Sequence, residues 1–236
     1  MCTSFIYRGD DTLIAMNYDN NGMNLKLASY NPEAFIVTIH SFGLDRPLFG
    51  IRNDGIFANQ QVVDECPEGK FRMGCHVIHT ADFVKKVLNG KISMEHMDSF
   101  LDKHKIVNPP KNSLHTMVAQ ANGSSYIIEP GRGNIKYDKT QRYAVMSNCS
   151  VYEASQNGKY DGFGVDRQLK AEKMLGNADN SFNVENAFDV LNAVHQIDDI
   201  WHTEFSLVYS ANENTVYYCY NHKFGNVEKY QLSLRQ

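Results

Sequence analysis

The chain has 236 residues, which is enough for one large domain or two small ones and for a core that needs no metal or disulfide. Its 23 basic and 27 acidic residues give a formal net charge of −4, which argues against a general nucleic-acid binder. Hydrophobic residues make up 42% of the chain, but no apolar run approaches the roughly 18 residues of a membrane span. We therefore expect a globular protein without a membrane segment.

Strands are predicted throughout the first quarter of the chain. Runs rich in β-forming residues, bounded by turn signals such as Gly9-Asp10-Asp11 and Asn53-Asp54-Gly55, predict strands over 3–8, 12–16, 35–40, 47–52 and 56–63.

After these strands, the apolar residues recur at the spacing of a helix. Apolar residues at 83, 84, 87 and 88 predict a helix from Thr80 that Asn89-Gly90 closes, and Ser93 is the expected N-cap of a second helix. Further on, the same patterns predict strands over 114–120, 124–129 and 143–146, helices over 165–175 and 184–194, and a closing meander over 204–210, 215–220 and 227–232. This order predicts a single α+β domain over residues 1–236, with helices that cover antiparallel sheets.

The five cysteines favour reduced thiols, because an odd number in a chain of this size does not suggest a disulfide framework. The amino terminus lacks a basic segment followed by an apolar one, so no signal peptide is predicted and the expected location is cytoplasmic.

Cys2 is the cysteine with a specific chemical possibility. It follows the initiator methionine, and its small side chain makes removal of Met1 the expected processing step. A free α-amine has a pKa near ~7.7–8.0, so one residue would supply both a thiol nucleophile and a general base. From position alone, an inert cysteine at a chain end is the simpler interpretation.

The motifs around Cys2 favour the reactive interpretation. Met1-Cys2-Thr3-Ser4 followed by Met16-Asn17-Tyr18-Asp19 resembles the opening of the choloylglycine hydrolase family, the linear amide C–N hydrolases that include bile salt hydrolases and penicillin V acylases. Further segments resemble the family's later motifs in the correct order: residues 114–129, 145–148, 166–171 and 203–209. The resemblance thus extends from residue 2 to about residue 220.

The resemblance implies a fold and a set of catalytic residues. The fold is the four-layer αββα sandwich of Ntn hydrolases, with antiparallel sheets. Cys2 would be nucleophile and base, Asp19 would position its amine, and Asn148 would donate to the oxyanion. A second oxyanion donor is expected just after Gly55, where Asn59 and Gln60 are the nearest polar residues; Asn59 is the predicted one.

Two positions depart from the family pattern. Met16 stands where the family has an arginine beside the cysteine, and Lys223 lies near the place of a late arginine of the last hairpin. Lysine does not replace arginine at a hydrogen-bonded site. Substrate preference and rate are therefore open.

Two other constellations were weighed against this site. Cys66, Cys75, His76 and His79 match no usual zinc spacing. His195 and His202, which flank Asp198-Asp199 and Trp201, are more simply a helix end and its exit loop than partners of Cys2 or Cys149 in a cysteine–histidine dyad.

The predicted function is hydrolysis of a linear amide bond in a small N-acylated substrate through an acyl-thioester. The alternatives are an acyltransferase of the same family and a catalytically silent binding protein on the same scaffold. No cofactor or metal is predicted, the partner is a small molecule rather than nucleic acid or membrane, and the resemblance implies a homotetramer.

Overall fold

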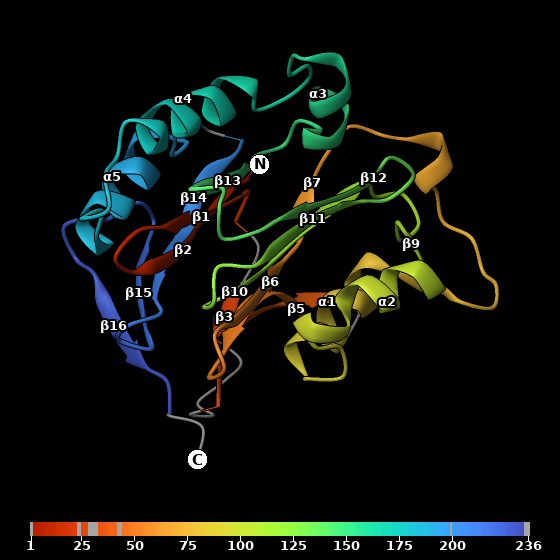
Figure 1. Ribbon diagram of the computed structural model, residues 1–236, viewed down its shortest axis with the longest axis horizontal. Helices are drawn as coiled ribbons and strands as arrows, with labels where there is room; N and C mark the ends of the chain where they lie inside the picture. The colour runs from red at the N-terminus through yellow and green to blue at the C-terminus, as the bar shows by residue number, and fades with distance from the viewer. Residues whose placement is uncertain (1, 23–24, 28–32, 42–43, 199, 234–236) are drawn as a thin grey trace.

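Two stacked antiparallel sheets form the centre of the computed structural model, which describes residues 2–22, 25–27, 33–41, 44–198 and 200–233 (Figure 1). The first sheet has the strand order β13-β1-β2-β14-β15-β16, and the second has the order β12-β11-β10-β6-β5-β4-β3, with β7 paired to β10. The first sheet consists of β1 (Cys2–Arg8), β2 (Thr12–Asn20), β13 (Tyr143–Met146), β14 (His202–Ser210), β15 (Thr215–Tyr220) and β16 (Glu228–Gln231). The second consists of β3 (Leu25–Leu27), β4 (Ala34–Ser41), β5 (Leu44–Arg52), β6 (Ile56–Asn59), β10 (Leu114–Gln120), β11 (Ser125–Glu129) and β12 (Gly133–Tyr137), with β7 (Gln61–Val62) beside it.

Helices cover the outer face of each sheet. α4 (Val165–Gly176) and α5 (Val184–Ala193) pack on the first sheet, and α1 (Thr80–Leu88) packs on the second beside α2 (Met97–Lys103) (Figure 1). The remaining elements are α3 (Val151–Asn157), the single turns η1 (Pro67–Gly69) and η2 (Met94–His96), and the parallel pair β8 (Val77–His79) and β9 (Lys105–Val107). The four layers confirm the predicted αββα sandwich.

The core divides among these layers. Alternating residues of β1 and β2 point inward, and Ile6, Ile14 and Met16 pack against Phe49 and Phe57 of the second sheet. Each fully buried side chain of this size contributes roughly 1.5–3 kcal/mol through removal of apolar surface from water. The opposite face of the first sheet packs on α4 and α5, where Asn183 and Asn186 form the capping box that begins α5.

Most predicted elements are present within two or three residues, apart from two differences in detail. The strand predicted over 56–63 is interrupted at Gln60, whose main chain bonds to Leu48, so it forms β6 and β7. Ser93 precedes a 3₁₀ turn before α2, and its hydroxyl contacts His96 instead of capping the main chain.

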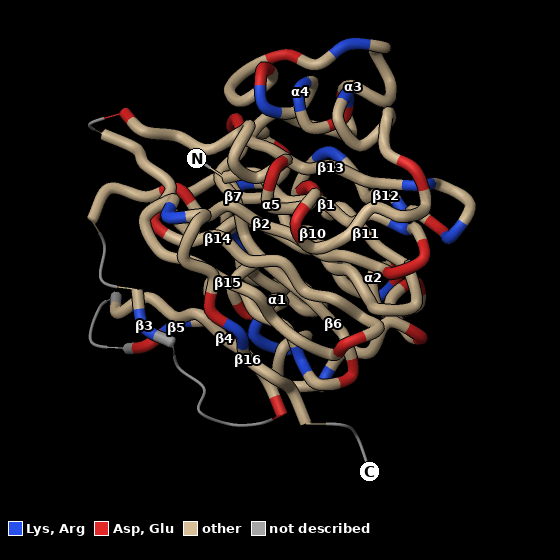
Figure 2. Tube along the Cα trace, turned by 90° about the vertical axis from the view of Figure 1, so that its left-hand side faces the viewer, with Lys and Arg blue, Asp and Glu red and all other residues tan. Residues whose placement is uncertain are grey.

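No helix in the described ranges is long and apolar enough to cross a membrane. Basic and acidic residues are interspersed on the side of the molecule shown in Figure 2. Met1, whose removal is predicted, lies outside the described residues, as does Asp199.

Candidate active site

Cys2 begins β1 at the end of the sandwich where β7, β13 and β14 also lie (Figure 1). Its neighbour across the strand pair is Tyr18, and both side chains belong to the core between the sheets. The thiol lies 4.0 Å from the main-chain oxygen of Asp19, and the residue is 4% exposed. Burial raises the pKa of the Cys2 thiol to about 11. A base close to the sulfur is therefore needed to form the thiolate at neutral pH.

Asn148 lies directly against the nitrogen of Cys2. That nitrogen donates to Asn148 Oδ1 at 2.7 Å, and Asn148 Nδ2 donates to the main-chain oxygen of Val62 at 2.6 Å. The amide thus joins β1 of the first sheet to β7 beside the second. Asn148 lies two residues after the end of β13, so the strand that pairs with β1 also places the amide at the first residue of β1.

Asp19 lies on the other face of the first sheet, next to the last residue of β2. Thr203 Oγ1 donates to Asp19 Oδ1 at 2.6 Å, because a β-bulge between Thr203 and Phe205 places Thr203 opposite Asp19. Burial raises the pKa of Asp19 to about 6, against the lowering effects of the Thr203 hydrogen bond and of the nearby positive charges. The ionised form of the Asp19 carboxyl therefore costs the folded protein free energy, because burial disfavours the charge.

The raised pKa of Asp19 predicts a specific dependence of stability on pH. The folded state binds this proton more tightly than the unfolded state, so the stabilisation is fully present below about pH 4 and is lost as pH rises through about pH 6. Asp19→Asn is therefore expected to raise the free energy of unfolding by ~1–3 kcal/mol near pH 7.5 and to leave it almost unchanged at about pH 4. Urea unfolding at both pH values measures this difference. Asp102→Asn, at an exposed acid of α2, is the control, and an equal effect of Asp19→Asn at both pH values would contradict the assignment.

Asn59, the predicted second oxyanion donor, lies deeper between the sheets. Its Nδ2 donates to Ser4 Oγ at 2.6 Å and lies 3.5 Å from the sulfur of Met16, and its Oδ1 accepts from the main-chain nitrogen of Met117 at 2.9 Å. Ser4 is on the same face of β1 as Cys2, two residues further along the strand. The hydrogen bonds of Asn59 thus support the strand beneath Cys2, and its donation to an oxyanion stays a prediction.

Arg167 belongs to the same cluster, although the sequence analysis gave it no role in the site. It lies in the first turn of α4 and is 4% exposed. Its Nη1 donates to the main-chain oxygen of Cys2 at 2.7 Å and lies 3.6 Å from Asp19 Oδ2, while its Nη2 donates to Asn148 Oδ1 at 2.8 Å. The signal in the sequence that could have indicated Arg167 is the resemblance of residues 166–171 to a helix motif of the family.

A buried ion pair holds the segment that carries Asn148. His115 and Glu129 are both fully buried, with Nδ1 and Oε1 3.5 Å apart, and His115 Nε2 donates to the main-chain oxygen of Ser147 at 2.7 Å. Glu129 accepts from Ser150 Oγ and from the main-chain nitrogen of Val151, which is the start of α3. Burial alone would raise the pKa of Glu129, but the hydrogen bond and charge of His115 hold it below its usual range. The pair therefore fixes the chain on both sides of Asn148.

The two other groups of histidines and cysteines in the sequence have contacts that do not involve this cluster. Among the described residues no group of histidines, cysteines and acids has the arrangement of a metal site. His195 Nδ1 bonds to the main chain of Asn192, and His202 lies 3.6 Å from Glu204, so the contacts of both rings are with groups other than a cysteine thiol.

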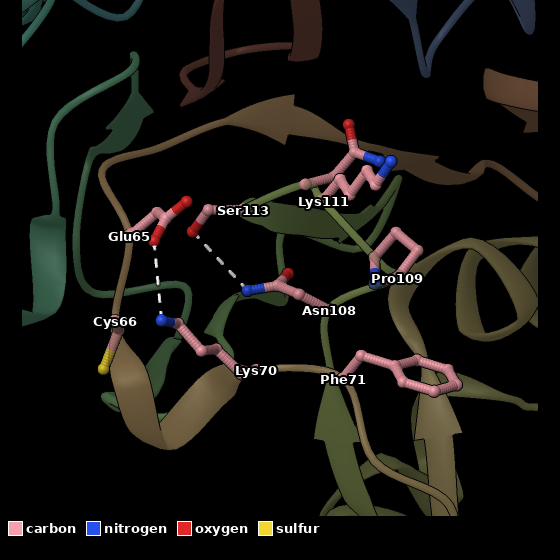
Figure 3. Close-up of a pocket in the computed structure, with 9 residues that line it drawn as sticks. Glu65, Cys66, Lys70, Phe71, Asn108, Pro109, Lys111 and Ser113 are labelled. Carbon is pink, nitrogen blue, oxygen red and sulfur yellow. Dashed lines mark hydrogen bonds and ion pairs between the residues drawn. The ribbon is translucent and has the colours of Figure 1, made fainter.

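A separate pocket of about 360 Å³ opens between the β7–η1 segment and the link from β9 to β10 (Figure 3). Its lining includes Glu65, Lys70, Asn108, Lys111 and Ser113. Lys70 pairs with Glu65 at 3.8 Å, and Asn108 Nδ2 lies 3.5 Å from Ser113 Oγ (Figure 3). The pocket includes none of the four predicted catalytic residues.

Comparisons with known proteins identify the fold. No protein-family model matches the chain, and no curated protein sequence matches it. Among solved structures, an arginine-to-leucine variant of conjugated bile acid hydrolase from Clostridium perfringens superposes with a TM-score of 0.72 at 14% identity, over 98% of this chain and 92% of that one. Penicillin V acylase from Agrobacterium tumefaciens gives a TM-score of 0.68 at 18% identity, over 93% and 83% of the two chains. An ortholog of N-acylethanolamine-hydrolyzing acid amidase from Caenorhabditis elegans gives a TM-score of 0.60 at 16% identity, over 89% of this chain and 93% of that one. These matches confirm the fold expected from the sequence motifs.

Proposed function

We propose that this chain, which has the αββα fold of these Ntn hydrolases, is an N-terminal-nucleophile cysteine amidase that cleaves a linear amide of a small N-acylated substrate. The observation that carries the proposal is the contact of the Cys2 nitrogen with Asn148, in a cluster where Arg167 contacts both of these residues and pairs with the Asp19 carboxylate. In this proposal Cys2 is the nucleophile, Asn148 is the oxyanion donor, and Asp19 acts on the amine through this cluster.

The proposed reaction begins once Met1 has been removed. The α-amine of Cys2 takes the thiol proton while the sulfur attacks the substrate carbonyl carbon. Asn148 Nδ2–H stabilises the resulting oxyanion, exchanging its bond to Val62 for one to substrate. The C–N bond then breaks, and the ammonium of Cys2 returns its proton to the leaving amine. Water, deprotonated by the same amine, hydrolyses the acyl-thioester and releases the acid.

Two exposed apolar side chains belong to segments that contact Asn148 or Asp19, and they support an apolar acyl group in the substrate. The side chain of Val62, whose carbonyl holds Asn148, is 55% exposed. Ile197 is 71% exposed and forms a β-bridge with His202, next to the Thr203 that bonds Asp19.

An amide panel tests the proposal directly. Purified protein is incubated with conjugated bile acids, penicillin V, N-acyl homoserine lactones, N-acyl amino acids and N-acylethanolamines, and the released amine is measured. We expect cleavage of at least one member. Added amine acceptors show whether water or an amine resolves the thioester. If folded protein that lacks Met1 cleaves no member of the panel, the proposal is contradicted.

A free amine on Cys2 gives a second prediction. Intact mass of active protein is expected to show the loss of Met1. A non-cleavable tag at the amino terminus is expected to reduce turnover by at least ~10²-fold, because it removes the general base, whereas the same tag at the carboxyl terminus serves as the control. Full turnover by the amino-terminally tagged protein would show that the base lies elsewhere.

Two proposals concern the whole protein. We propose a homotetramer by the family resemblance, which light scattering of the purified protein tests. We propose a cytoplasmic location from the expected reduced thiols, which fractionation of cells that express the protein tests.

A further inference from the structure

Tyr18 differs from the other tyrosines of the core, because its hydroxyl has no hydrogen-bond partner. Six tyrosines are buried in the part of the chain that the structure describes. The five whose hydroxyls bond to a carbonyl, carboxylate or amide oxygen are Tyr7, Tyr126, Tyr209, Tyr217 and Tyr218. Within the same residues, Tyr18 forms no such bond. Since a buried tyrosine usually finds a partner for its O–H, the exception indicates a group that is kept free for a ligand.

The free hydroxyl belongs to the residue opposite the candidate nucleophile. Tyr18 of β2 is the neighbour of Cys2 across the strand pair, and both side chains lie on the face of the first sheet that is turned toward the second. The Cβ atoms of such neighbours are about 4.5–5.5 Å apart. The fully enclosed side-chain oxygens and nitrogens without a partner, in the described ranges, do not include the Tyr18 hydroxyl, so its oxygen reaches solvent. A donor is therefore open to a substrate on the side of the thiol.

Aromatic packing from both sheets fixes the Tyr18 ring. The centroid of the ring lies 5.5 Å from that of Phe49 in the second sheet. On the side away from Cys2, Tyr18 is paired with Phe205 of β14, whose ring lies 5.7 Å from Phe49. The position of the hydroxyl is thus set before any substrate binds. Donors that are already in place need no reorganisation when charge develops on a substrate oxygen, which is what makes them effective in catalysis.

The surroundings also keep the Tyr18 hydroxyl protonated. Burial raises the pKa of Tyr18, and the negative charges of Cys2, Glu204 and Asp19 raise it further. A phenol in this environment stays an O–H donor at neutral pH, even beside an ionised thiol. It can therefore stabilise a developing negative charge without giving up its proton.

The second donor position of the proposed oxyanion site has a better candidate in Tyr18 than in Asn59. Oxyanions of acyl transfer are typically held by more than one donor. Asn59 Nδ2 already donates to Ser4 Oγ, and its Oδ1 accepts from the main chain of Met117, so a turn of this amide toward substrate would break both bonds. The Tyr18 hydroxyl has no bond to break.

We propose that Tyr18 is a catalytic residue: its O–H donates to the oxyanion that forms when the Cys2 sulfur attacks the amide carbonyl, together with Asn148 Nδ2. The inference rests on the proposed amidase function. The hydrogen bond strengthens as the carbonyl oxygen gains negative charge, and it weakens when the C–N bond breaks and the carbonyl forms again. Tyr18 keeps its proton and its electrons throughout. In the motif Met16-Asn17-Tyr18-Asp19, the family resemblance gave a role to Asp19 and none to Tyr18.

The test compares Tyr18→Phe, which removes only the hydroxyl, with Tyr209→Phe. Turnover of the amide that the native protein cleaves fastest is expected to fall about 10²-fold in kcat for Tyr18→Phe, with little change in KM, because the bond forms only when the oxyanion exists. Its Tm is expected to stay within about 1 °C of the native value, since the folded protein loses no hydrogen bond. Tyr209→Phe removes a hydroxyl of the same core that bonds Asn214. This control is expected to lower Tm by about 2–4 °C and to keep native kcat.

Alkylation of Cys2 by iodoacetamide, followed against pH by peptide mass spectrometry, gives a second readout. The thiolate displaces iodide from a carbon atom and no oxyanion forms, so Tyr18→Phe is expected to keep the native rate and pH midpoint. Native kcat in Tyr18→Phe, a loss confined to KM, or a shifted alkylation midpoint would each overturn the inference. Turnover that survives in Cys2→Ala would instead overturn the amidase function, so the two failures are distinguishable.

Discussion

Cys2→Ala is expected to abolish amide hydrolysis and leave the fold almost unchanged. The substitution removes the nucleophile, and loss of the nucleophile in a hydrolase typically lowers kcat by more than ~10⁴-fold. Only one sulfur is lost from the packing between the sheets, so the cost in stability is about 1 kcal/mol. Steady-state turnover and thermal unfolding of the same preparation measure both effects.

The matched control is Cys219→Ala, which truncates another buried thiol on β15, in the core beneath α5. It is expected to lose similar stability and to retain native turnover. Turnover by Cys2→Ala close to that of the native protein would show that the chemistry belongs to another residue.

Asn148→Ala is expected to lose about 10²–10³-fold in kcat, the usual effect of removing one oxyanion donor. The amide has two tasks in the proposed mechanism, because Oδ1 holds the Cys2 nitrogen while Nδ2 is the donor. Turnover kinetics of Asn148→Ala and Asn148→Asp separate these tasks.

The aspartate variant keeps an acceptor for Cys2 and Arg167 but has no N–H. If Asn148 is the oxyanion donor, Asn148→Asp is expected to be as slow as Asn148→Ala. Near-native kcat in the aspartate variant would restrict the role of Asn148 to holding Cys2. Asn112→Ala, at the separate pocket, is a control that is expected to keep full activity.

The regular elements could largely be predicted from the sequence because their apolar residues follow a clear period. α1 shows this best, since Phe83, Val84, Val87 and Leu88 form one buried face. The elements that escaped prediction depend on distant partners. α3 is only seven residues long, and Glu129 of β11 bonds the start of the helix. β12 has a half-exposed pattern, typical of an edge strand, and β8 and β9 have three residues each.

The candidate site was predicted in part. The Cys2 nitrogen contacts Asn148 and the Cys2 thiol lies near the main chain of Asp19, whereas the catalytic roles of these residues stay predictions. Arg167 was missed as a site residue because a basic residue on a polar helix is usually a solvated one, and nothing local marks it as buried. The contacts of Asn59 could not be anticipated either, since its partners Ser4 and Met117 come from the two opposing sheets.

The polar groups at the middle of the sandwich have a consequence for how the two layers are aligned. Apolar packing is non-directional, and by itself it would let one layer slide along the other at little cost. Asn59 and Gln61 both contact Ser4, and Gln61, in the orientation that satisfies both ends of its amide, also donates to the carbonyls of Met146 and Ser147. These directional bonds would break on displacement by a single residue. They therefore fix the alignment in which Asn148 can bond both Cys2 and Val62, much as one polar residue sets the register of a coiled coil.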